Sequence, residues 1–177
     1  MTNFKDLPDV DAGLYPEISA AIASALSAGA LLGFHCDLVE IGYGDFASMS
    51  ELTFPEAFAM DAFGDIFVRH ADGIARIDTE TGDVGGTWGS PYDWLADVAS
   101  NPDRTLGLRL LKEWENLNGP LAEGHRLTPK IPFVFGGSYD PMNIVSAPVS
   151  DILEFRSDIA HQIRDLPDGA RVLLDTD

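Results

Sequence analysis

The chain has 177 residues, 45% of them apolar and 10% aromatic, which is the composition of one folded domain with a sizeable core. It carries 29 acids against 11 bases, a formal net charge of −18 with a pI near 4.2. Such a field repels nucleic-acid phosphates and anionic lipid, so we expect neither a nucleic-acid nor a membrane partner. No apolar run reaches the roughly 20 residues that span a bilayer.

The acidic N-terminus lacks the basic and apolar regions of a signal peptide, and the single cysteine, Cys36, excludes an internal disulfide framework. These features predict a cytoplasmic location. The acids are unevenly spread, because no Lys or Arg occurs between Lys5 and Arg69. That basic-free stretch holds eleven acids: Asp6, Asp9, Asp11, Glu17, Asp37, Glu40, Asp45, Glu51, Glu56, Asp61 and Asp65. It is either a solvated acidic surface or a docking face for a basic protein.

In chain order, residues 1–13 read as an irregular N-terminal arm. Apolar residues at a spacing of four predict a first helix over about 16–28, with Gly29 as its stop. Residues 31–41 alternate as a strand would, but they could also extend the helix. From Glu56 the pattern becomes an antiparallel meander, with strands predicted over 62–69, 74–77 and 84–88 and tight turns between them.

Two helices follow the meander. Ser90 and Pro91 provide an N-cap and a first helical position for a helix that ends at Asn101. A second helix is predicted over about 103–117, although Gly107 in its interior costs about 1 kcal/mol relative to Ala.

The last third mixes both types of element. We predict a strand over 132–135, a partner strand over 143–146, an amphipathic helix over about 148–164 and a final strand over 171–174. The whole order predicts a single α+β domain over 1–177, with a mostly antiparallel or mixed sheet flanked by helices.

Patterns for catalysis or metal binding are weak. The four histidines are widely separated, and adjacent strand residues such as His35, Cys36 and Asp37 would point to opposite faces. Gly136-Gly137-Ser138 lacks the closing glycine of a nucleophile turn and the lysine of a phosphate loop, so we interpret these glycines as close-packing or turn positions. Asp61 and Asp65 could form an acid–base pair, but chance pairs are expected among so many acids. We therefore predict no catalytic residues, no metal and no cofactor.

Trp88, Tyr92 and Trp94 cluster across a strand end and a helix start. Packing in the core is the default interpretation, whereas a partly exposed trio would provide anchors for a protein partner.

The two turns of the meander carry a recognisable pattern. Phe63-Gly64-Asp65-Ile66-Phe67 followed by Asp78-Thr79-Glu80-Thr81-Gly82 resembles the "fGdif…d..tG" hairpins of bacterial type VI secretion immunity proteins. Residues 132–137 followed by Asn143-Ile144 resemble the "P..lGG…eN" element of the related SUKH-like immunity proteins, and residues 152–169 resemble their closing helix and turn. The resemblance covers roughly residues 56–174 and implies a non-enzymatic α+β protein that binds and neutralises a cognate toxin.

The leading hypothesis is therefore an immunity protein that occludes the active site of a cognate, basic toxin. Residues expected to contact the partner are Asp37, Glu40, Asp45, Glu51, Glu56, Asp61, Asp65, Trp88, Tyr92 and Trp94. The first alternative is a non-enzymatic scaffold or regulatory module of the same fold. The second is a small hydrolase with a carboxylate pair, which predicts a concave pocket holding two acids of raised pKa.

Overall fold

The computed structural model describes residues 24, 25, 27, 29–33, 43–52, 56–167, 169 and 170. A five-stranded sheet has the order β1-β2-β3-β4-β5, and a second, two-stranded sheet pairs β6 with β7. The strands are β1 (Leu31–Gly33), β2 (Glu56–Asp61), β3 (Ile66–His70), β4 (Gly73–Ile77), β5 (Val84–Trp88), β6 (His125–Pro129) and β7 (Ile144–Pro148). The α-helices are α2 (Tyr43–Met49), α3 (Pro91–Ser100), α4 (Pro102–Leu106), α5 (Leu108–Asn118) and α6 (Val149–Ile163), with 3-10 turns η3 (Phe133–Phe135) and η4 (Pro141–Asn143). This confirms the predicted α+β class with antiparallel sheets.

Neighbouring strands of the large sheet are all antiparallel, so the chain forms a meander from β1 to β5. The predicted strands over 74–77 and 84–88 are observed, but the strand predicted over 62–69 begins only at Ile66. Residues 62–65 form the turn after β2 instead. Of the ambiguous segment 31–41, residues 31–33 form β1 and the remainder lies outside the described residues.

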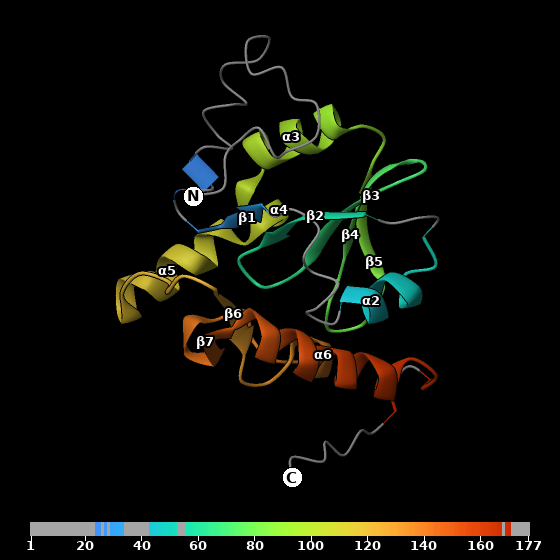
Figure 1. Ribbon diagram of the computed structural model, residues 1–177. Coiled ribbons are helices and arrows are strands. Elements are labelled where there is room, and N and C mark those ends of the chain that lie inside the picture. The colour runs from blue at the N-terminus through green and yellow to red at the C-terminus, as the bar shows by residue number, and fades with distance from the viewer. Residues whose placement is uncertain are drawn as a thin grey trace.

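Both faces of the large sheet are covered (Figure 1), with α3, α4 and α5 on one face and α2 and α6 on the other. Successive residues of β3 point to opposite faces, so Phe67 joins the cluster beneath α3 while Ile66 and Val68 join the cluster against α6. Burial on both faces explains why β3 reads as a continuous apolar run and not as an alternating one.

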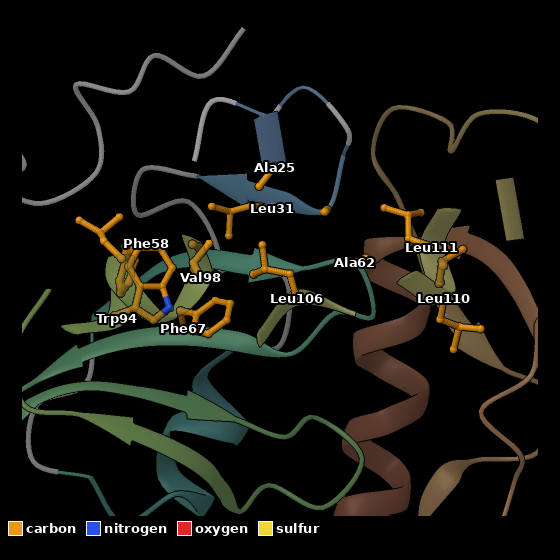
Figure 2. Close-up of a cluster of buried hydrophobic side chains, with 14 of the residues drawn as sticks. Ala25, Leu31, Phe58, Ala62, Phe67, Trp94, Val98, Leu106, Leu110 and Leu111 are labelled. Carbon is orange, nitrogen blue, oxygen red and sulfur yellow. The ribbon is translucent and has the colours of Figure 1, made fainter. Parts of the chain in front are cut away.

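Aromatic packing dominates the core on the α3 side, where Trp94, Phe58 and Phe67 lie together (Figure 2). Trp94 meets Phe58 edge to face, with ring centroids 5.1 Å apart, and its centroid lies 5.3 Å from that of Phe67. Such pairs stabilise the core beyond the simple burial of their area.

The helix signals after the sheet are partly correct. Ser90 is the N-cap of α3, because its hydroxyl oxygen accepts the backbone N–H of Asp93. The single helix predicted over 103–117 is wrong: Gly107 adopts φ +67, ends α4, and leaves α5 to start afresh at Leu108. A Cβ on Gly107 would also collide with the ring of Phe63, so both the φ angle and the available space require glycine there.

The predicted strand over 132–135 is also wrong, because Phe133–Phe135 is a 3-10 turn. The strand predicted over 143–146 exists as β7, but its partner is β6, which the sequence pattern did not indicate. The helix predicted over 148–164 is confirmed as α6. Of the first predicted helix, the described residues Ser24, Ala25 and Ser27 are helical, and Gly29 follows with φ +70.

The N-terminal arm 1–13 and the strand predicted over 171–174 lie outside the described residues. Within the described part of the chain, no helix has both the length and the apolarity that crossing a membrane requires.

Candidate functional site

A pocket of about 610 Å³ opens where five segments of the chain meet. These segments are the turn between β2 and β3, the turn between β4 and β5, the junction of α4 with α5, the loop between β6 and β7, and one face of α6. Its lining is charged and aromatic: Asp61, Phe63, Asp65, Arg76, Asp78, Glu80, Thr81, Asp103, Arg104, Gly107, Arg109, Leu110, Phe133, Val134, Tyr139 and Arg156. The volume lies within the range of roughly 300–1,000 Å³ typical of ligand sites.

The turn between β2 and β3 is built around Asp61. One oxygen of its carboxyl group, Oδ1, accepts the backbone N–H of Phe63 at 2.8 Å and that of Asp65 at 3.0 Å. Gly64 closes the turn with φ +89, a conformation that glycine adopts without a steric penalty. The turn places Asp61, Phe63 and Asp65 on the pocket wall.

The turn between β4 and β5 repeats this arrangement around Asp78. The Asp78 carboxylate accepts the backbone N–H of Glu80 at 2.8 Å, and Gly82 donates its own N–H to the Asp78 carbonyl at 2.8 Å. Gly82 has φ +79, and a Cβ there would collide with Met49. The turn places Asp78, Glu80 and Thr81 on the pocket wall.

Thr79 and Arg156 connect the two turns. Asp65 Oδ1 accepts the backbone N–H of Thr79 at 3.2 Å, and the Thr79 hydroxyl accepts a hydrogen bond from Arg156 Nη1 at 2.7 Å. Arg156 is only 2% exposed and reaches the turns from α6. The hairpin residues that carry the family resemblance therefore converge at one place in the structure.

Ion pairs within the pocket are long. Arg156 Nη2 lies 3.6 Å from Glu80 Oε1, Arg156 Nη1 lies 3.8 Å from Asp65 Oδ1, and Arg76 Nε lies 3.8 Å from Asp65 Oδ2. Although buried, Glu80 Oε1 makes no hydrogen bond, and neither do Arg76 Nε, Arg156 Nε and Arg156 Nη2. Buried polar atoms in this state are costly unless a ligand or water engages them.

Burial of the carboxyl groups shifts their acidity. Desolvation, followed by repulsion from Asp65, raises the pKa of Asp61 to about 8 and that of Asp78 to about 6. Burial also raises the pKa of Glu80, against the opposing effect of Arg156. Behind Asp61, burial lowers the pKa of Arg126 to about 10. At neutral pH, Asp61 is therefore largely protonated.

One wall of the pocket belongs to the loop between β6 and β7, residues 130–143, which Asn143 holds in shape. The Asn143 amide accepts the N–H of Ile131 at 3.0 Å and donates to the carbonyls of Ile131 at 3.1 Å and Ser138 at 3.0 Å. Tyr139 stacks on Phe133 with ring centroids 4.0 Å apart, and the Val134 N–H donates to Glu80 Oε2 at 3.0 Å.

The same loop presents large apolar side chains to solvent. Ile131 is 58% exposed, Val134 39%, Tyr139 70% and Met142 73%. Together these four residues are named here the apolar rim. Isolated exposed apolar residues are ordinary, but four on one loop beside a pocket are typical of an interaction surface.

Of the predicted partner-binding acids whose side chains the structure describes, Asp61 and Asp65 line the pocket and Glu51 does not. Asp61 is just 3% exposed and its carboxyl group closes a turn, so it is not an outward-facing acid, and its contact with a partner stays a prediction. Glu51 is exposed and lies 3.9 Å from Arg164 Nη2, away from the pocket lining. Asp37 and Glu40 lie outside the described residues, as do the side chains of Asp45 and Glu56.

The aromatic trio separates. Trp94 is 1% exposed and belongs to the core, so its predicted role as a partner contact is wrong. Its ring packs against the rings of Phe58 and Phe67. Trp88 packs partly on the same core and donates its indole N–H to Asp97 at 3.0 Å. Tyr92 is 46% exposed at the start of α3.

Sequence reasoning missed Arg156, Glu80 and Tyr139 as site residues. A signal for Arg156 was present: it falls on the apolar face of α6, three residues before Ile159 and three after Leu153, and all three residues are buried. A lone charge at such a position needs buried partners.

Gly136 and Gly137 adopt the backbone roles that the sequence predicts for them. Gly136 has φ +83 and a Cβ on Gly137 would overlap the Ile131 carbonyl, which are the turn and close-packing roles expected of them. In the described part of the chain, no cluster of three or more His, Cys, Asp or Glu side chains is arranged to hold a metal. His35, Cys36 and Asp37 lie outside the described residues.

Comparisons with known proteins add a fold relationship. No protein-family model matches the chain, and no curated protein sequence matches it. The crystal structure of Atu4351 from Agrobacterium tumefaciens is similar over 89% of this chain and 81% of that chain, with a TM-score of 0.51 and 14% sequence identity. At that identity the likeness concerns the fold alone.

Proposed function

We propose that this protein is an immunity protein of the SUKH-like, type VI secretion class, which binds a cognate bacterial toxin in the cytoplasm and occludes its active site. The observation that carries the proposal is the convergence of the resembling hairpin turns on one pocket beside the apolar rim. A surface that combines exposed apolar side chains with buried charge suits a protein partner.

The net negative charge of the protein supports a basic protein as the partner. The chain carries a net charge of −18, and long-range attraction would speed its encounter with a basic protein. Enzymes that act on nucleic acid or anionic substrates commonly present basic surfaces, and an acidic protein can cover such a surface. The apolar rim would then set the lifetime of the complex, since related interfaces differ mostly in their dissociation rates.

The direct test is rescue of growth. Tagged protein is captured from its native cells, the stoichiometric partner is identified by mass spectrometry, and that partner is expressed in a bacterial host with and without this protein. We expect the partner alone to stop growth and co-expression to restore it.

Matched variants sharpen this test. Met142→Ser and Tyr139→Ala change the exposed apolar rim, whereas Leu117→Ser changes an exposed apolar residue on α5, outside the pocket lining. We expect weaker rescue from the first two variants and normal rescue from the third. A stoichiometric partner that is harmless when expressed alone would instead support the scaffold or regulatory alternative.

One observation favours a second candidate, a hydrolase that uses a carboxyl pair. The pocket does hold two acids of raised pKa, Asp61 at about 8 and Asp78 at about 6. Both groups, however, already accept backbone N–H groups that close their turns, which is a structural use of the carboxyl oxygens.

A hydrolase screen separates the two candidates. Catalysis by this pair predicts turnover of ester, amide or glycoside substrates that is lost in Asp78→Asn, while Asp83→Asn, an exposed change in the same turn, leaves it intact. Turnover with that pattern would overturn the immunity proposal in favour of the enzyme.

A further inference from the structure

We propose that the pocket is a receptor site for one cationic side chain, an arginine or lysine, that the partner protein inserts beside Glu80 and beneath Tyr139. The identity of the partner rests on the function proposed above, but the chemistry of the site can be tested on this protein alone. Three features carry the inference: the balance of charge, a buried carboxylate oxygen without a hydrogen bond, and an aromatic pair.

Carboxyl groups outnumber cations in the inner part of the pocket. Asp61 is largely protonated at neutral pH, so the ionised carboxylates of the inner lining are Asp65, Asp78 and Glu80, against Arg76 and Arg156. The other charged lining residues, Asp103, Arg104 and Arg109, are exposed and lie on α4 and α5 at its edge. Arg126 is buried, interacts with Asp61 and does not line the pocket, so the lining itself holds one carboxylate more than it holds guanidiniums. A guest with a positive charge would complete the balance.

Glu80 supplies a specific acceptor. Its side chain is 5% exposed, and Oε2 is engaged by the Val134 N–H at 3.0 Å. Oε1 has no hydrogen bond, and its ion-pair contact with Arg156 Nη2, at 3.6 Å, is too long to be one. A buried carboxylate oxygen in this state favours a charged donor, because charge-assisted hydrogen bonds are the strongest available to it.

The aromatic pair at the rim suits a cation as well. Tyr139 stacks on Phe133, and both rings line the same pocket as Glu80. Burial, with further repulsion from Glu80, Asp78 and Asp65, raises the pKa of Tyr139. A guanidinium between an aromatic face and a carboxylate gains both a cation–π contact and an ion pair.

An anionic guest fits less well. The unpaired nitrogens of Arg156 would attract one, but Asp65 and Glu80 already flank this guanidinium at 3.8 Å and 3.6 Å. An incoming carboxylate or phosphate would meet both acids at close range, and like charges in a partly buried site repel strongly.

The probe for the experiment is N-acetyl-arginine amide, compared with N-acetyl-citrulline amide and N-acetyl-glutamic acid amide. Citrulline keeps the shape of arginine without the charge, and glutamate tests the anionic alternative. Binding to the full chain is followed by NMR chemical shifts and by calorimetry. We expect the arginine probe to bind and to shift the signals of Tyr139 and of the Val134 amide, while the other two probes do not.

Two variants locate the site. Glu80→Gln should weaken the arginine probe about tenfold, since a charge-assisted hydrogen bond is lost. Tyr139→Ala should weaken it about two- to fivefold, because one cation–π contact is lost. Tyr139 is 70% exposed, so its removal leaves the fold intact even if Glu80→Gln disturbs it. Glu123→Gln, an exposed change that does not line the pocket, is the matched control and should bind as the unaltered chain does.

The outcomes separate this inference from the proposed function. Equal binding of the citrulline probe, preferred binding of the glutamate probe, or binding unaffected by both Glu80→Gln and Tyr139→Ala would overturn the cationic site. If no probe binds while the unaltered protein still rescues growth, the cationic site is wrong and the proposed function remains supported. If the arginine probe binds as expected but no toxic partner exists, the cationic site is supported and the proposed function is wrong.

Discussion

Two regions of the large sheet, here called the aromatic end and the charged end, bury different kinds of side chain. Beneath α3, aromatic and aliphatic side chains fill the space, and Trp94, Phe58 and Phe67 contact one another directly. At the turns that face α6, carboxyl groups and guanidiniums occupy the interior instead, and they form long ion pairs. The aromatic end stabilises the fold, whereas the charged end costs stability and keeps polar atoms ready for a ligand.

The largest expected loss of stability comes from a substitution in the aromatic end. Trp94→Ala removes the largest fully buried side chain and should lower the free energy of unfolding by about 3–5 kcal/mol, a large share of the roughly 5–15 kcal/mol typical of a domain. Urea denaturation followed by circular dichroism measures this loss. Tyr92→Ala, on the same helix but 46% exposed, is the control and should cost less than about 1 kcal/mol. Similar losses from both variants would show that the aromatic cluster does not dominate stability.

The next effect concerns the buried cation of the charged end. Arg156→Met keeps an unbranched, flexible stem but leaves Glu80 and Asp65 without their shared guanidinium, which should cost about 3 kcal/mol at neutral pH. Burial already raises the pKa of Glu80, and loss of Arg156 raises it further. Ionising the carboxyl group in the folded state then becomes more costly, so the loss of stability should be larger at pH 8 than at pH 5. Arg164→Met, a half-exposed change near the end of α6, serves as the control.

An effect independent of pH would contradict this account, because it would mean that Arg156 acts by packing alone. Denaturation midpoints at both pH values, measured for the two variants and the unaltered chain, distinguish these cases.

How well the sequence predicts each end depends on how far apart in the sequence the interacting residues lie. The meander depends on local turns and alternating strands, so β4 and β5 are predicted almost to the residue. β6 and β7 pair across an intervening loop, and the polar sequence of β6 carries no local strand signal. Residues 132–135 look like a strand because they are apolar, yet Pro132 and Gly136 confine them to a single 3-10 turn.

The site was harder to predict than the fold, because its members come from distant segments. Asp65 and Glu80 belong to motifs visible in the sequence, but Arg156 joins them from α6, and its hydrogen bond to Thr79 spans 77 positions. The acid excess indicated an outer docking face, whereas the structure buries Asp61 and uses it to close a turn. Charge counts report the overall field of a chain and not which carboxyl groups are buried.

The pH dependence of stability measures the contribution of Asp61. Its pKa is about 8 in the folded chain against an ordinary value of 3.8, so between these values the folded state holds a proton that the unfolded state has released. Stability from this group therefore falls as pH rises from about 4 to 8, by up to about 1.4 kcal/mol per pH unit. Asp61→Asn keeps the acceptor for the Phe63 and Asp65 N–H groups but cannot release a proton.

We therefore expect Asp61→Asn to flatten the curve of unfolding free energy between pH 5 and pH 8, and the exposed change Asp72→Asn to leave its slope unaltered. Urea titrations across this range give the slope directly. Parallel curves for the unaltered chain and Asp61→Asn would place the raised pKa on another carboxyl group of the pocket.

The smallest effect should come from Asn143, which shapes the pocket wall without contributing charge. Asn143→Ala removes three hydrogen bonds to Ile131 and Ser138, and should lower the free energy of unfolding by about 1–2 kcal/mol. Because the same loop holds the Val134 N–H against Glu80, amide exchange at Val134 should accelerate while exchange in β3 and β4 changes little. Asn116→Ala, an exposed amide on α5, controls for loss of the side chain itself. Faster exchange throughout β3 and β4 would mean that the loop is part of the central fold, and the contrast between a stable sheet and an adaptable pocket wall would not hold.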